Sequence, residues 1–437
     1  MQQKVQRPAF LSGSLTVPGD KSISHRALML NAIAEGRAVV TGLSQGGDVL
    51  STMRCLQALG VNIGPGKIPG AVEVLGAGQG LREPSDILDA GNSGTSMRLL
   101  SGLLAAQPFV SVMTGDGSLR SRPMGRVVQP LKRMGAVIMG RDNDNLAPLT
   151  IRGGALRGIE YSMPVASAQV KSSIMLAALY AEGDTVLHQP ALSRDHTERM
   201  VEAMGAAVEA DGMTLVLHPG RLKAVDIDVP GDISSAAFWL VAGLCHPNSR
   251  VVVRGVGLNP SRTGIIEALQ AMGAGSSLSP VEERTAGGEP MADLLVTSGQ
   301  LQGIEIGGDM IPRIIDELPV LAVAACFAQG TTVIRDAQEL RVKESDRIAT
   351  TVAELGRLGA RIEAREDGMV VQGTGRLVGA PCQSHGDHRL AMALAVAGLL
   401  AEGVTTVDGA EAAAVSYPDF WQHLAQLSGT ACPARVR

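Results

Sequence analysis

Two recurring helix endings divide this chain into similar units, and no other feature of the sequence restricts the fold as strongly. The first ending is Ala or Cys, then any residue, then Gly or Pro, and a β-like segment follows each copy. Its six copies are Ala34-Glu35-Gly36, Ala106-Gln107-Pro108, Ala181-Glu182-Gly183, Cys245-His246-Pro247, Ala328-Gln329-Gly330 and Ala401-Glu402-Gly403. Because the copies are spread over the whole chain, they predict six structural repeats.

The second ending places Leu or Met before Gly and a small residue. Its copies are Leu59-Gly60-Val61, Met134-Gly135-Ala136, Met204-Gly205-Ala206, Met272-Gly273-Ala274 and Leu358-Gly359-Ala360, with a degenerate sixth at Leu427-Ser428-Gly429. Glycine is favoured in the left-handed position that closes a helix, so each copy predicts a helix end. Each unit of about 70 residues then reads strand, helix, strand, helix, strand. Glycine follows many unrelated helices, but the regular spacing argues for a repeat.

A longer repeat predicts two domains. Val17-Pro18-Gly19-Asp20 reappears as Val229-Pro230-Gly231-Asp232, and an apolar helix follows each copy. We interpret both as crossings between domains of three units each, and we expect the β-like segment Leu11 to Val17 to pair with the C-terminal domain. The predicted N-terminal domain is 19–230, and the predicted C-terminal domain combines 1–18 with 231–437. For such an architecture the expected active site lies in the cleft between the domains.

Composition and charge disfavour several functional classes. With 45% apolar residues among 437, the chain can bury a sizeable core, whereas aromatic residues make up only 2% and the net charge is -5. A nucleic-acid partner is not expected, because neither a basic footprint nor a set of stacking rings is present. Met1 to Val17 lacks the apolar core of a signal peptide, and no apolar run approaches the ~18 residues of a membrane span. We therefore expect a cytoplasmic protein.

The cysteines indicate free thiols. They are Cys55, Cys245, Cys326, Cys382 and Cys432. Their number is odd and neighbours lie at least 50 residues apart, which fits neither a disulfide framework nor the spacing of a CxxC metal site. Cys55, Cys245 and Cys326 sit in apolar helical patterns, so we expect them to be packed rather than reactive.

The segment from Gly19 to Arg26 predicts an anion-binding helix start. Ser22 or Ser24 can cap a helix that runs from about His25 to Ile33, while Lys21 and Arg26 add positive charge near its beginning. Helix N-termini offer unpaired N–H groups and the positive end of the dipole, so they favour phosphate and carboxylate. A capped surface helix is the plainer alternative.

Further loops of the N-terminal half have the same layout. Gly91 and Gly94 precede a helix, and their small size lets a ligand approach the backbone. Polar helix starts with similar potential are Gly115 to Arg126 with Arg120, Arg122 and Arg126, then Ser167-Ala168-Gln169-Val170-Lys171, and Ser193-Arg194-Asp195-His196-Thr197-Glu198. Arginine forks bind carboxylate and phosphate through two bonds. Ordinary glycine turns, a solvated basic face and routine N-caps remain the alternatives.

Candidates for acid–base chemistry lie in the C-terminal half. Asp316 and Glu317 stand at the mouth of the apolar helix Val320 to Ala328, where desolvation can raise a carboxyl pKa. Before the helix Ile348 to Leu358, Lys343 and Arg347 are expected on one helix face at i, i+4. A helix cap and a salt-bridged helix face are the alternatives.

Two histidines raise the question of a metal. His385 and His388 are three residues apart at the start of an apolar helix. We disfavour a metal site, since no third ligand lies at zinc spacing and Arg389 would repel a cation.

Taken in order, these motifs resemble the enolpyruvyl transferases, a family with the two-domain inside-out α/β barrel fold. The motifs that carry the resemblance are Pro18-Gly19-Asp20-Lys21-Ser22-Ile23-Ser24-His25-Arg26, Gly91-Asn92-Ser93-Gly94-Thr95, Arg122-Pro123-Met124-Gly125, Arg341-Val342-Lys343-Glu344-Ser345-Asp346-Arg347 and Asp387-His388-Arg389. The resemblance covers essentially the whole chain. It implies an α/β fold of six β-α-β-α-β-β-like units, three per domain.

The resemblance also implies a reaction: transfer of the enolpyruvyl group of phosphoenolpyruvate to the 5-hydroxyl of shikimate-3-phosphate, with release of phosphate. No metal or organic cofactor is expected. The implied shikimate-3-phosphate contacts are Lys21, Ser22, Arg26, Ser167, Ala168, Gln169, Arg194, Asp316 and Lys343, and those to phosphoenolpyruvate are Lys21, Gly94, Arg122, Gln169, Arg347 and Arg389. The implied catalytic residues are Asp316, which accepts the hydroxyl proton, Glu344, which protonates the methylene carbon, and Lys21.

Some positions depart from the family pattern, as in its divergent second class. Ala168 stands where many members have serine, His25 where many have asparagine, and Val415 where many have a phosphoenolpyruvate-binding lysine. The resemblance implies glyphosate as a competitor of phosphoenolpyruvate. Gly94 leaves room for it, whereas Leu99 replaces the usual proline.

Two other functions remain possible from the sequence. The protein is expected to be a monomer. The sister enzyme that acts on UDP-N-acetylglucosamine uses a loop cysteine, which is lacking between Gly115 and Arg126. A non-catalytic repeat protein that binds anions would gain nothing from Asp316 and Glu344 among its cations.

Overall fold

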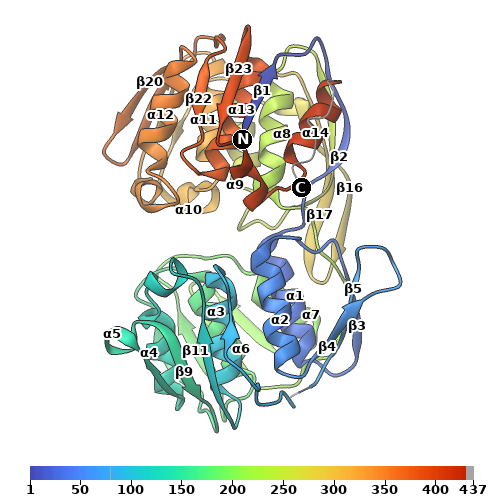
Figure 1. Cartoon of the computed structure of the whole chain (residues 1–437), viewed down its shortest axis with the longest axis vertical. Coiled ribbons are helices and arrows are strands. Elements are labelled where there is room, and N and C mark those ends of the chain that lie inside the picture. Colours follow the sequence, from blue (N-terminus) through green and yellow to red (C-terminus); the bar gives the residue numbers. More distant parts are fainter. Residues whose placement is uncertain (79, 430–437) are drawn as a thin grey trace. The chain divides into compact units, whose positions relative to one another are not determined.

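The protein is described by a computed structural model that covers residues 1–78 and 80–429. These residues form two compact units of mixed α/β structure. The N-terminal unit consists of Gly19–Pro230 together with Thr285–Glu289. The C-terminal unit contains Met1–Pro18, Gly231–Arg284 and the chain from Pro290 onward (Figure 1). The junctions at 18/19 and 230/231 fall inside the two Val-Pro-Gly-Asp segments.

Three four-stranded sheets of one topology build the N-terminal unit. In spatial order they are β14 (Ile227–Asp228), β3 (Arg37–Thr41), β5 (Val72–Leu75) and β4 (Asn62–Pro65); then β6 (Leu88–Asp89), β7 (Val110–Thr114), β9 (Leu146–Arg152) and β8 (Val137–Gly140); and β10 (Glu160–Ser162), β11 (Thr185–His188), β13 (Thr214–Leu217) and β12 (Val208–Asp211). In each sheet the first two strands are parallel and the others antiparallel.

The C-terminal unit repeats this topology in two four-stranded sheets, and its last sheet has three strands. Its sheets are β2 (Leu11–Thr16), β15 (Ser249–Gly257), β17 (Glu289–Thr297) and β16 (Leu278–Ala286); then β18 (Glu305–Ile306), β19 (Thr331–Ile334), β21 (Gly368–Gln372) and β20 (Arg361–Arg365); and β22 (Pro381–Gln383), β23 (Val404–Asp408) and β1 (Gln2–Gln6). Thus β1 supplies a strand to the last sheet although it lies at the other end of the chain.

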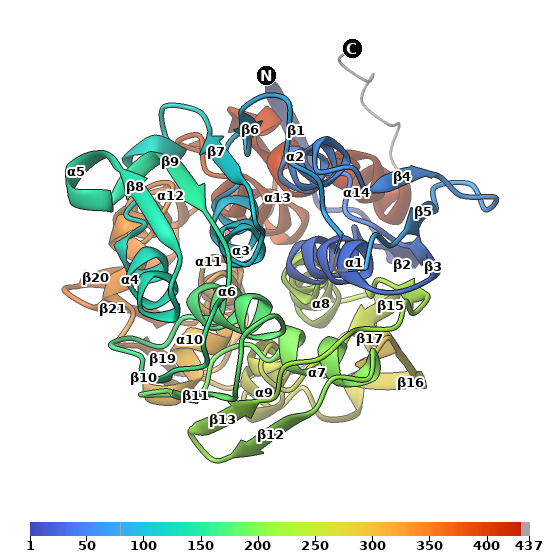
Figure 2. The same ribbon diagram turned by 90° about the horizontal axis from the view of Figure 1, so that it is seen from below.

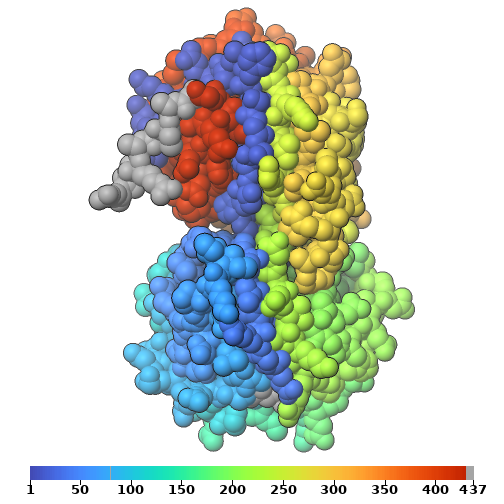
Figure 3. All heavy atoms as spheres, turned by 90° about the vertical axis from the view of Figure 1, so that its right-hand side faces the viewer, coloured from blue at the N-terminus to red at the C-terminus, as the bar shows by residue number. Residues whose placement is uncertain are grey.

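The exchange of strands between chain ends confirms one expectation. β2 pairs in parallel with β15, with Leu11 opposite Ser249, so the segment before Val17 does belong with the C-terminal unit (Figure 3). Conversely, β14 comes from the end of the N-terminal unit and pairs with β3 near its beginning.

One long helix from each repeat lies inside its unit, surrounded by the sheets (Figure 2). These helices are α1 (Lys21–Ile33), α3 (Gly94–Ala105) and α6 (Ala168–Ala178) in the N-terminal unit, and α8 (Ile233–Cys245), α11 (Leu318–Phe327) and α13 (His388–Leu400) in the C-terminal unit. They are buried on all sides over most of their length, and α1 and α6 bury polar side chains near their starts as well. α3 packs very closely on α6, because a Cβ on Gly102 would lie 2.0 Å from the Ser173 carbonyl oxygen.

A second helix of each repeat covers the outside of the unit, and its end confirms the predicted glycine caps. These helices are α2 (Gly47–Ala58), α4 (Gly125–Met134), α7 (His196–Ala203), α9 (Gly264–Ala271), α12 (Arg347–Arg357) and α14 (Phe420–Ser428). The glycines that follow them have positive φ: Gly60 87°, Gly135 117°, Gly205 94°, Gly273 97°, Gly359 84° and Gly429 65°. Even the degenerate sixth copy is therefore a left-handed helix end.

Buried cysteines agree with the expectation of free thiols. Cys55, Cys245, Cys326 and Cys382 form no disulfide, and Cys432 lies outside the described residues. Burial raises the pKa of the Cys55 thiol to about 11 and that of Cys326 to about 12, so neither is a reactive thiolate. No helix in the described part of the chain is both long and apolar enough to cross a membrane.

Candidate functional site

The first helix of the N-terminal unit begins earlier than expected. α1 starts at Lys21, and its cap is Asp20, whose Oδ1 accepts the backbone N–H of Ile23 at 2.9 Å. The predicted start near His25 with a Ser22 or Ser24 cap is therefore wrong. Because Asp20 is the N-cap, Lys21 and Ser22 lie in the first turn of the helix. The Lys21 ammonium pairs with the Asp48 carboxylate at 3.0 Å.

Arg26 joins three helix starts through its guanidinium. Its Nε donates to Thr197 Oγ1 at 2.7 Å, its Nη2 to Ser172 Oγ at 2.6 Å and its Nη1 to the Ser22 carbonyl at 2.9 Å. The side chain is buried, and desolvation together with the charge of Arg194 lowers its pKa to about 10, although Glu198 and other carboxylates oppose this. Arg26 and Arg194, predicted from separate motifs, therefore interact electrostatically within one unit.

His25 begins a chain of hydrogen bonds toward the Gly94 loop. Its Nδ1 bonds to Thr52 Oγ1 at 2.7 Å, and Thr52 Oγ1 bonds to Ser96 Oγ at 2.6 Å. Ser96 in turn bonds to Ser93, the N-cap of α3, at 2.7 Å. Desolvation and the charge of Lys21 lower the His25 pKa to about 3, so the ring is neutral near pH 7.

Stability in weak acid is expected to depend on His25. Its folded pKa of about 3 lies below the ordinary histidine value of 6.5, so the unfolded chain binds the proton first. The contribution is fully present above pH 6.5 and is lost as the pH falls toward 3. When the pH falls from about 7 to about 5.5, the free energy of unfolding should decrease by about 1 kcal/mol because of His25. Urea unfolding at the two pH values measures this decrease. The variant His25→Asn should show a flatter pH dependence, and an unchanged slope would contradict this.

The starts of α3 and α6 present polar side chains to each other. Gln169 Oε1 accepts Arg98 Nη1 at 2.7 Å, and its Nε2 donates to Thr95 Oγ1 at 3.0 Å. Ser167 is the N-cap of α6, with Ala168 as the first helical residue. A Cβ at Gly94 would lie 3.0 Å from Arg98 Nη1 and 3.5 Å from Arg122 Nη1. The structure thus brings Gly94, Arg122 and Gln169 close to one another through Arg98.

Arg122 is held by the neighbouring loop. It follows the short helix η1 (Leu119–Ser121), and its Nη2 donates to Asn92 Oδ1 at 2.8 Å and to Ser118 Oγ at 3.2 Å. Asn92 also donates to Asp116 at 2.6 Å. This bond comes first among the causes that hold the Asp116 pKa below its usual value.

In the C-terminal unit the adjacent carboxylates Asp316 and Glu317 differ in exposure and in hydrogen-bond partners. The Asp316 side chain is 27% exposed and accepts Arg347 Nη1 at 3.3 Å. Glu317 is buried, caps α11 and bonds to Ser234, which also accepts Arg262 Nη2 at 2.8 Å. Burial and then the charge of Asp316 raise the Glu317 pKa. Because Glu317 is buried and bonded to Ser234 whereas Asp316 is partly exposed, Asp316 is the more accessible candidate base.

Lys343 lies in a loop, not on a helix. It follows η4 (Gln338–Val342), and α12 begins only at Arg347, so the predicted i, i+4 helix face for Lys343 and Arg347 is wrong. Asp346 is the N-cap of α12, since its Oδ1 accepts the Ala349 N–H at 3.0 Å. The loop that contains Lys343 therefore extends as far as Asp346. Lys343 instead pairs with Glu339 at 2.6 Å.

Arg389 stands in the first turn of α13 and is 8% exposed. Among the described residues, its Nε and Nη1 are buried and have no hydrogen-bond partner. Desolvation and the Arg389 charge lower the pKa of His388 to about 3, while His385 bonds to Glu354 at 2.9 Å. No group of three or more His, Cys, Asp or Glu side chains within 1–78 and 80–429 is arranged to hold a metal.

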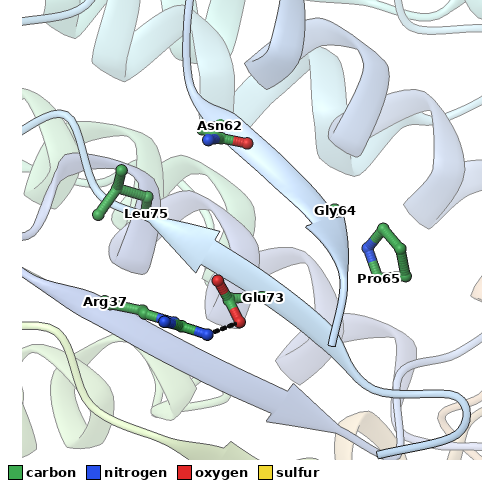
Figure 4. Close-up of a pocket in the computed structure, with 6 residues that line it drawn as sticks. All are labelled: Arg37, Asn62, Gly64, Pro65, Glu73 and Leu75. Carbon is green, nitrogen blue, oxygen red and sulfur yellow. Dashed lines mark hydrogen bonds and ion pairs between the residues drawn. The ribbon is translucent and has the colours of Figure 1, made fainter. Parts of the chain in front are cut away.

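A pocket of about 320 Å³ lies away from all of these residues (Figure 4). It is formed by β3, β4 and β5 of the N-terminal unit. Its polar side chains Arg37 and Glu73 pair with each other. None of the expected site residues lines it.

Some residues around the site were not predicted from their motifs. Asp387 Oδ2 accepts a hydrogen bond from Arg347 Nε at 2.8 Å, although the two residues are forty positions apart in the sequence. Thr197 and Ser172 bind Arg26, and Thr52 connects His25 with Ser96. Asp387 and Thr197 stand at helix starts, where a polar residue is expected as a cap, but Thr52 and Ser172 lie further inside α2 and α6. Their partners could not be read from these positions.

Comparison with known proteins identifies the family. Residues 5–424 match the family model of EPSP synthase (3-phosphoshikimate 1-carboxyvinyltransferase). The chain is 55% identical to the 3-phosphoshikimate 1-carboxyvinyltransferase of Herpetosiphon aurantiacus, covering 98% of this chain and 99% of the relative. It is 57% identical to that of Gloeobacter violaceus, covering 95% and 96%. The solved EPSP synthase from Acinetobacter baumannii superposes with a TM-score of 0.92 at 46% identity, covering 98% of both chains.

Fold and matches define an enolpyruvyl transferase with the two-domain inside-out α/β barrel. The chain belongs to the EPSP synthase family. The predicted fold and family are thereby confirmed, and the UDP-N-acetylglucosamine enzyme and the non-catalytic binder are disfavoured. The enzyme transfers the enolpyruvyl group of phosphoenolpyruvate to shikimate-3-phosphate in the shikimate pathway.

Proposed function

We propose that the predicted residues of both units carry this reaction. Shikimate-3-phosphate would be bound by Lys21, Ser22, Arg26, Ser167, Ala168, Gln169, Arg194, Asp316 and Lys343, and phosphoenolpyruvate by Lys21, Gly94, Arg122, Gln169, Arg347 and Arg389. The main support is the hydrogen bonding of Arg26 and Gln169, which ties the starts of α1, α3, α6 and α7 together. Helix starts with added cations suit two anionic substrates. A site in the cleft between the domains stays a prediction.

Asp316 and Glu344 are proposed as the acid–base pair. The 5-hydroxyl oxygen forms a bond to C2 of phosphoenolpyruvate as its proton passes to Asp316, and Glu344 gives a proton to C3. Because the product again carries a CH2=C group, C3 then returns a proton to the Glu344 carboxylate as the C2–O bond to phosphate breaks and phosphate leaves. Cations such as Lys21 would stabilise the crowded negative charge during both steps.

Phosphate release tests the function directly. Wild-type enzyme should release phosphate from phosphoenolpyruvate only when shikimate-3-phosphate is present. Replacing shikimate-3-phosphate by UDP-N-acetylglucosamine should give no release. Release that needs no acceptor, or that prefers the nucleotide sugar, would refute the proposed function.

Glyphosate is proposed to compete with phosphoenolpyruvate at Gly94. The variant Gly94→Ala should raise its inhibition constant at least ~10-fold, about 1.4 kcal/mol. The reason is steric, since the new methyl group would crowd Arg98 and Arg122, whose nearest atoms are 3.0 and 3.5 Å away. These atoms are flexible side-chain ends, so the fold should survive. Inhibition kinetics at varied phosphoenolpyruvate measure the effect, and an unchanged constant would contradict the steric argument.

We also propose a cytoplasmic monomer. Four described cysteines are free thiols, as is usual in a reducing compartment. Light scattering at working concentration would test the monomer.

A further inference from the structure

Arg347 is bonded to three carboxylates at once. Its Nε donates to Asp387 Oδ2 at 2.8 Å, and its Nη2 donates to Asp387 Oδ1 at 3.3 Å. Nη2 also donates to Glu344 Oε2 at 2.7 Å, while Nη1 donates to Asp316 Oδ1 at 3.3 Å. All three nitrogens of the guanidinium therefore have anionic partners. Two of these partners are the proposed base and acid of the reaction.

The three carboxylates differ in burial. The Asp387 side chain is 0% exposed, and its Oδ1 also accepts the Arg389 N–H at 2.8 Å as the cap of α13. Burial would raise the pKa of Asp387, but its bond to Arg347 holds it below the usual value. In contrast, the Glu344 side chain is 51% exposed and that of Asp316 is 27% exposed. Asp387 is thus a fixed partner, whereas the other two can turn toward solvent.

This arrangement leaves an incoming anion one edge of Arg347. A guanidinium binds carboxylate or phosphate through two parallel N–H groups. The edge formed by Nε and Nη2 is held by the buried Asp387. The remaining edge, formed by Nη1 and Nη2, is held by Asp316 and Glu344. An anion that binds Arg347 through two bonds must therefore displace these two carboxylates.

We propose that phosphoenolpyruvate binds Arg347 by exchange: the substrate anion replaces Glu344 and Asp316 at the outer edge, while Asp387 keeps the guanidinium in place. The inference rests on the proposed function, which assigns Arg347 to phosphoenolpyruvate. Its consequence is a coupling between binding and chemistry. The acid and the base leave their ion pairs only when the anion that they act on has arrived. Asp387 is accordingly a positioning residue, since it acts through Arg347.

The exchange predicts opposite effects for neighbouring carboxylates. Glu344→Gln removes a competitor, so phosphoenolpyruvate should bind about 3- to 10-fold more tightly even though turnover falls. Asp387→Asn removes the charge that fixes Arg347, so binding should weaken at least ~10-fold. Glu305→Gln is the matched control: it removes one charge from an exposed ion pair with Arg335 in the same unit, and binding should stay within about twofold.

Calorimetric titration of the full-length variants with phosphoenolpyruvate measures these affinities. Where binding to the enzyme alone is too weak, KM for phosphoenolpyruvate at saturating shikimate-3-phosphate gives the comparison, because KM approaches the dissociation constant when chemistry is slow. Equal or weaker binding by Glu344→Gln would overturn the exchange. Tighter binding by Asp387→Asn and Glu305→Gln as well would also overturn it, since a general charge effect would then suffice.

Failure of this inference is distinguishable from failure of the proposed function. Wild-type enzyme that releases phosphate only with shikimate-3-phosphate retains the proposed function whatever the variants show. Thermal unfolding of Asp387→Asn checks that the variant is folded. If it is not, Glu344→Gln against Glu305→Gln still decides the question.

Discussion

Asp316→Asn is expected to lower kcat by about 10²- to 10⁴-fold, the usual contribution of a general base. The amide keeps the shape of the side chain but cannot accept the proton of the attacking hydroxyl. Because Asp316 bonds to Arg347 and is only partly buried, the variant should fold. The proposed exchange at Arg347 also predicts about 3- to 10-fold tighter binding of phosphoenolpyruvate, as for Glu344→Gln. Steady-state phosphate release at saturating substrates measures the loss.

Glu317→Gln is the matched control for Asp316→Asn. Burial raises the Glu317 pKa, and the carboxyl bonds to Ser234, so an amide can replace it with little change. Its kcat should stay within about threefold of wild type. If Glu317→Gln caused the large loss and Asp316→Asn did not, the base would be assigned to the wrong carboxylate.

Much of the fold could be predicted because its repeats carry a local signal. Glycine at a left-handed helix end has a clear physical reason, and all six predicted copies have positive φ. The strands that close the sheets carried no such signal. β6 and β14 each contain two residues, which is too short for an alternating pattern. β1 pairs with β23 at the opposite end of the chain, and only the folded structure reveals that pairing.

The candidate site was predicted less completely, for reasons of direction and distance. Adjacent residues at a helix start point different ways, so the pair Asp316 and Glu317 could not be separated by spacing alone. Asp20 and the serines after it are all good N-caps, and the backbone geometry selects Asp20. The bonds of Arg347 to Asp387 and of Arg26 to Thr197 join distant segments, so their pairing follows from tertiary structure.

Two buried arginines of the C-terminal unit differ in how their charge is compensated. Arg347 has its pKa raised, since burial would lower it but the bonds to Asp387 and the charges of Glu344 and Asp316 outweigh this. Its positive charge is therefore already compensated inside the protein. Arg389 is also buried, yet two of its nitrogens have no hydrogen-bond partner in the described chain. A buried polar group without a partner costs folding free energy, so Arg389 is maintained against stability.

Arg389→Met should therefore affect function and stability in opposite directions. Loss of a buried cation that binds an anion typically costs about 2–5 kcal/mol, so KM for phosphoenolpyruvate should rise at least ~30-fold. Methionine fills similar space without the two nitrogens that lack a hydrogen-bond partner, so the free energy of unfolding of the C-terminal unit should rise by about 1 kcal/mol, or about 2–4 °C in Tm. Steady-state kinetics and thermal unfolding measure the two effects.

Arg250→Met is the control, because Arg250 is exposed on β15 and its loss should change neither quantity. An unchanged KM in Arg389→Met would remove Arg389 from the phosphoenolpyruvate site. A lower Tm would show that the guanidinium contributes to folding through its remaining nitrogen. If Arg389→Met raised both KM and Tm, Arg389 would be a group kept for the substrate at the expense of stability. Removing a purely structural arginine would lower Tm instead.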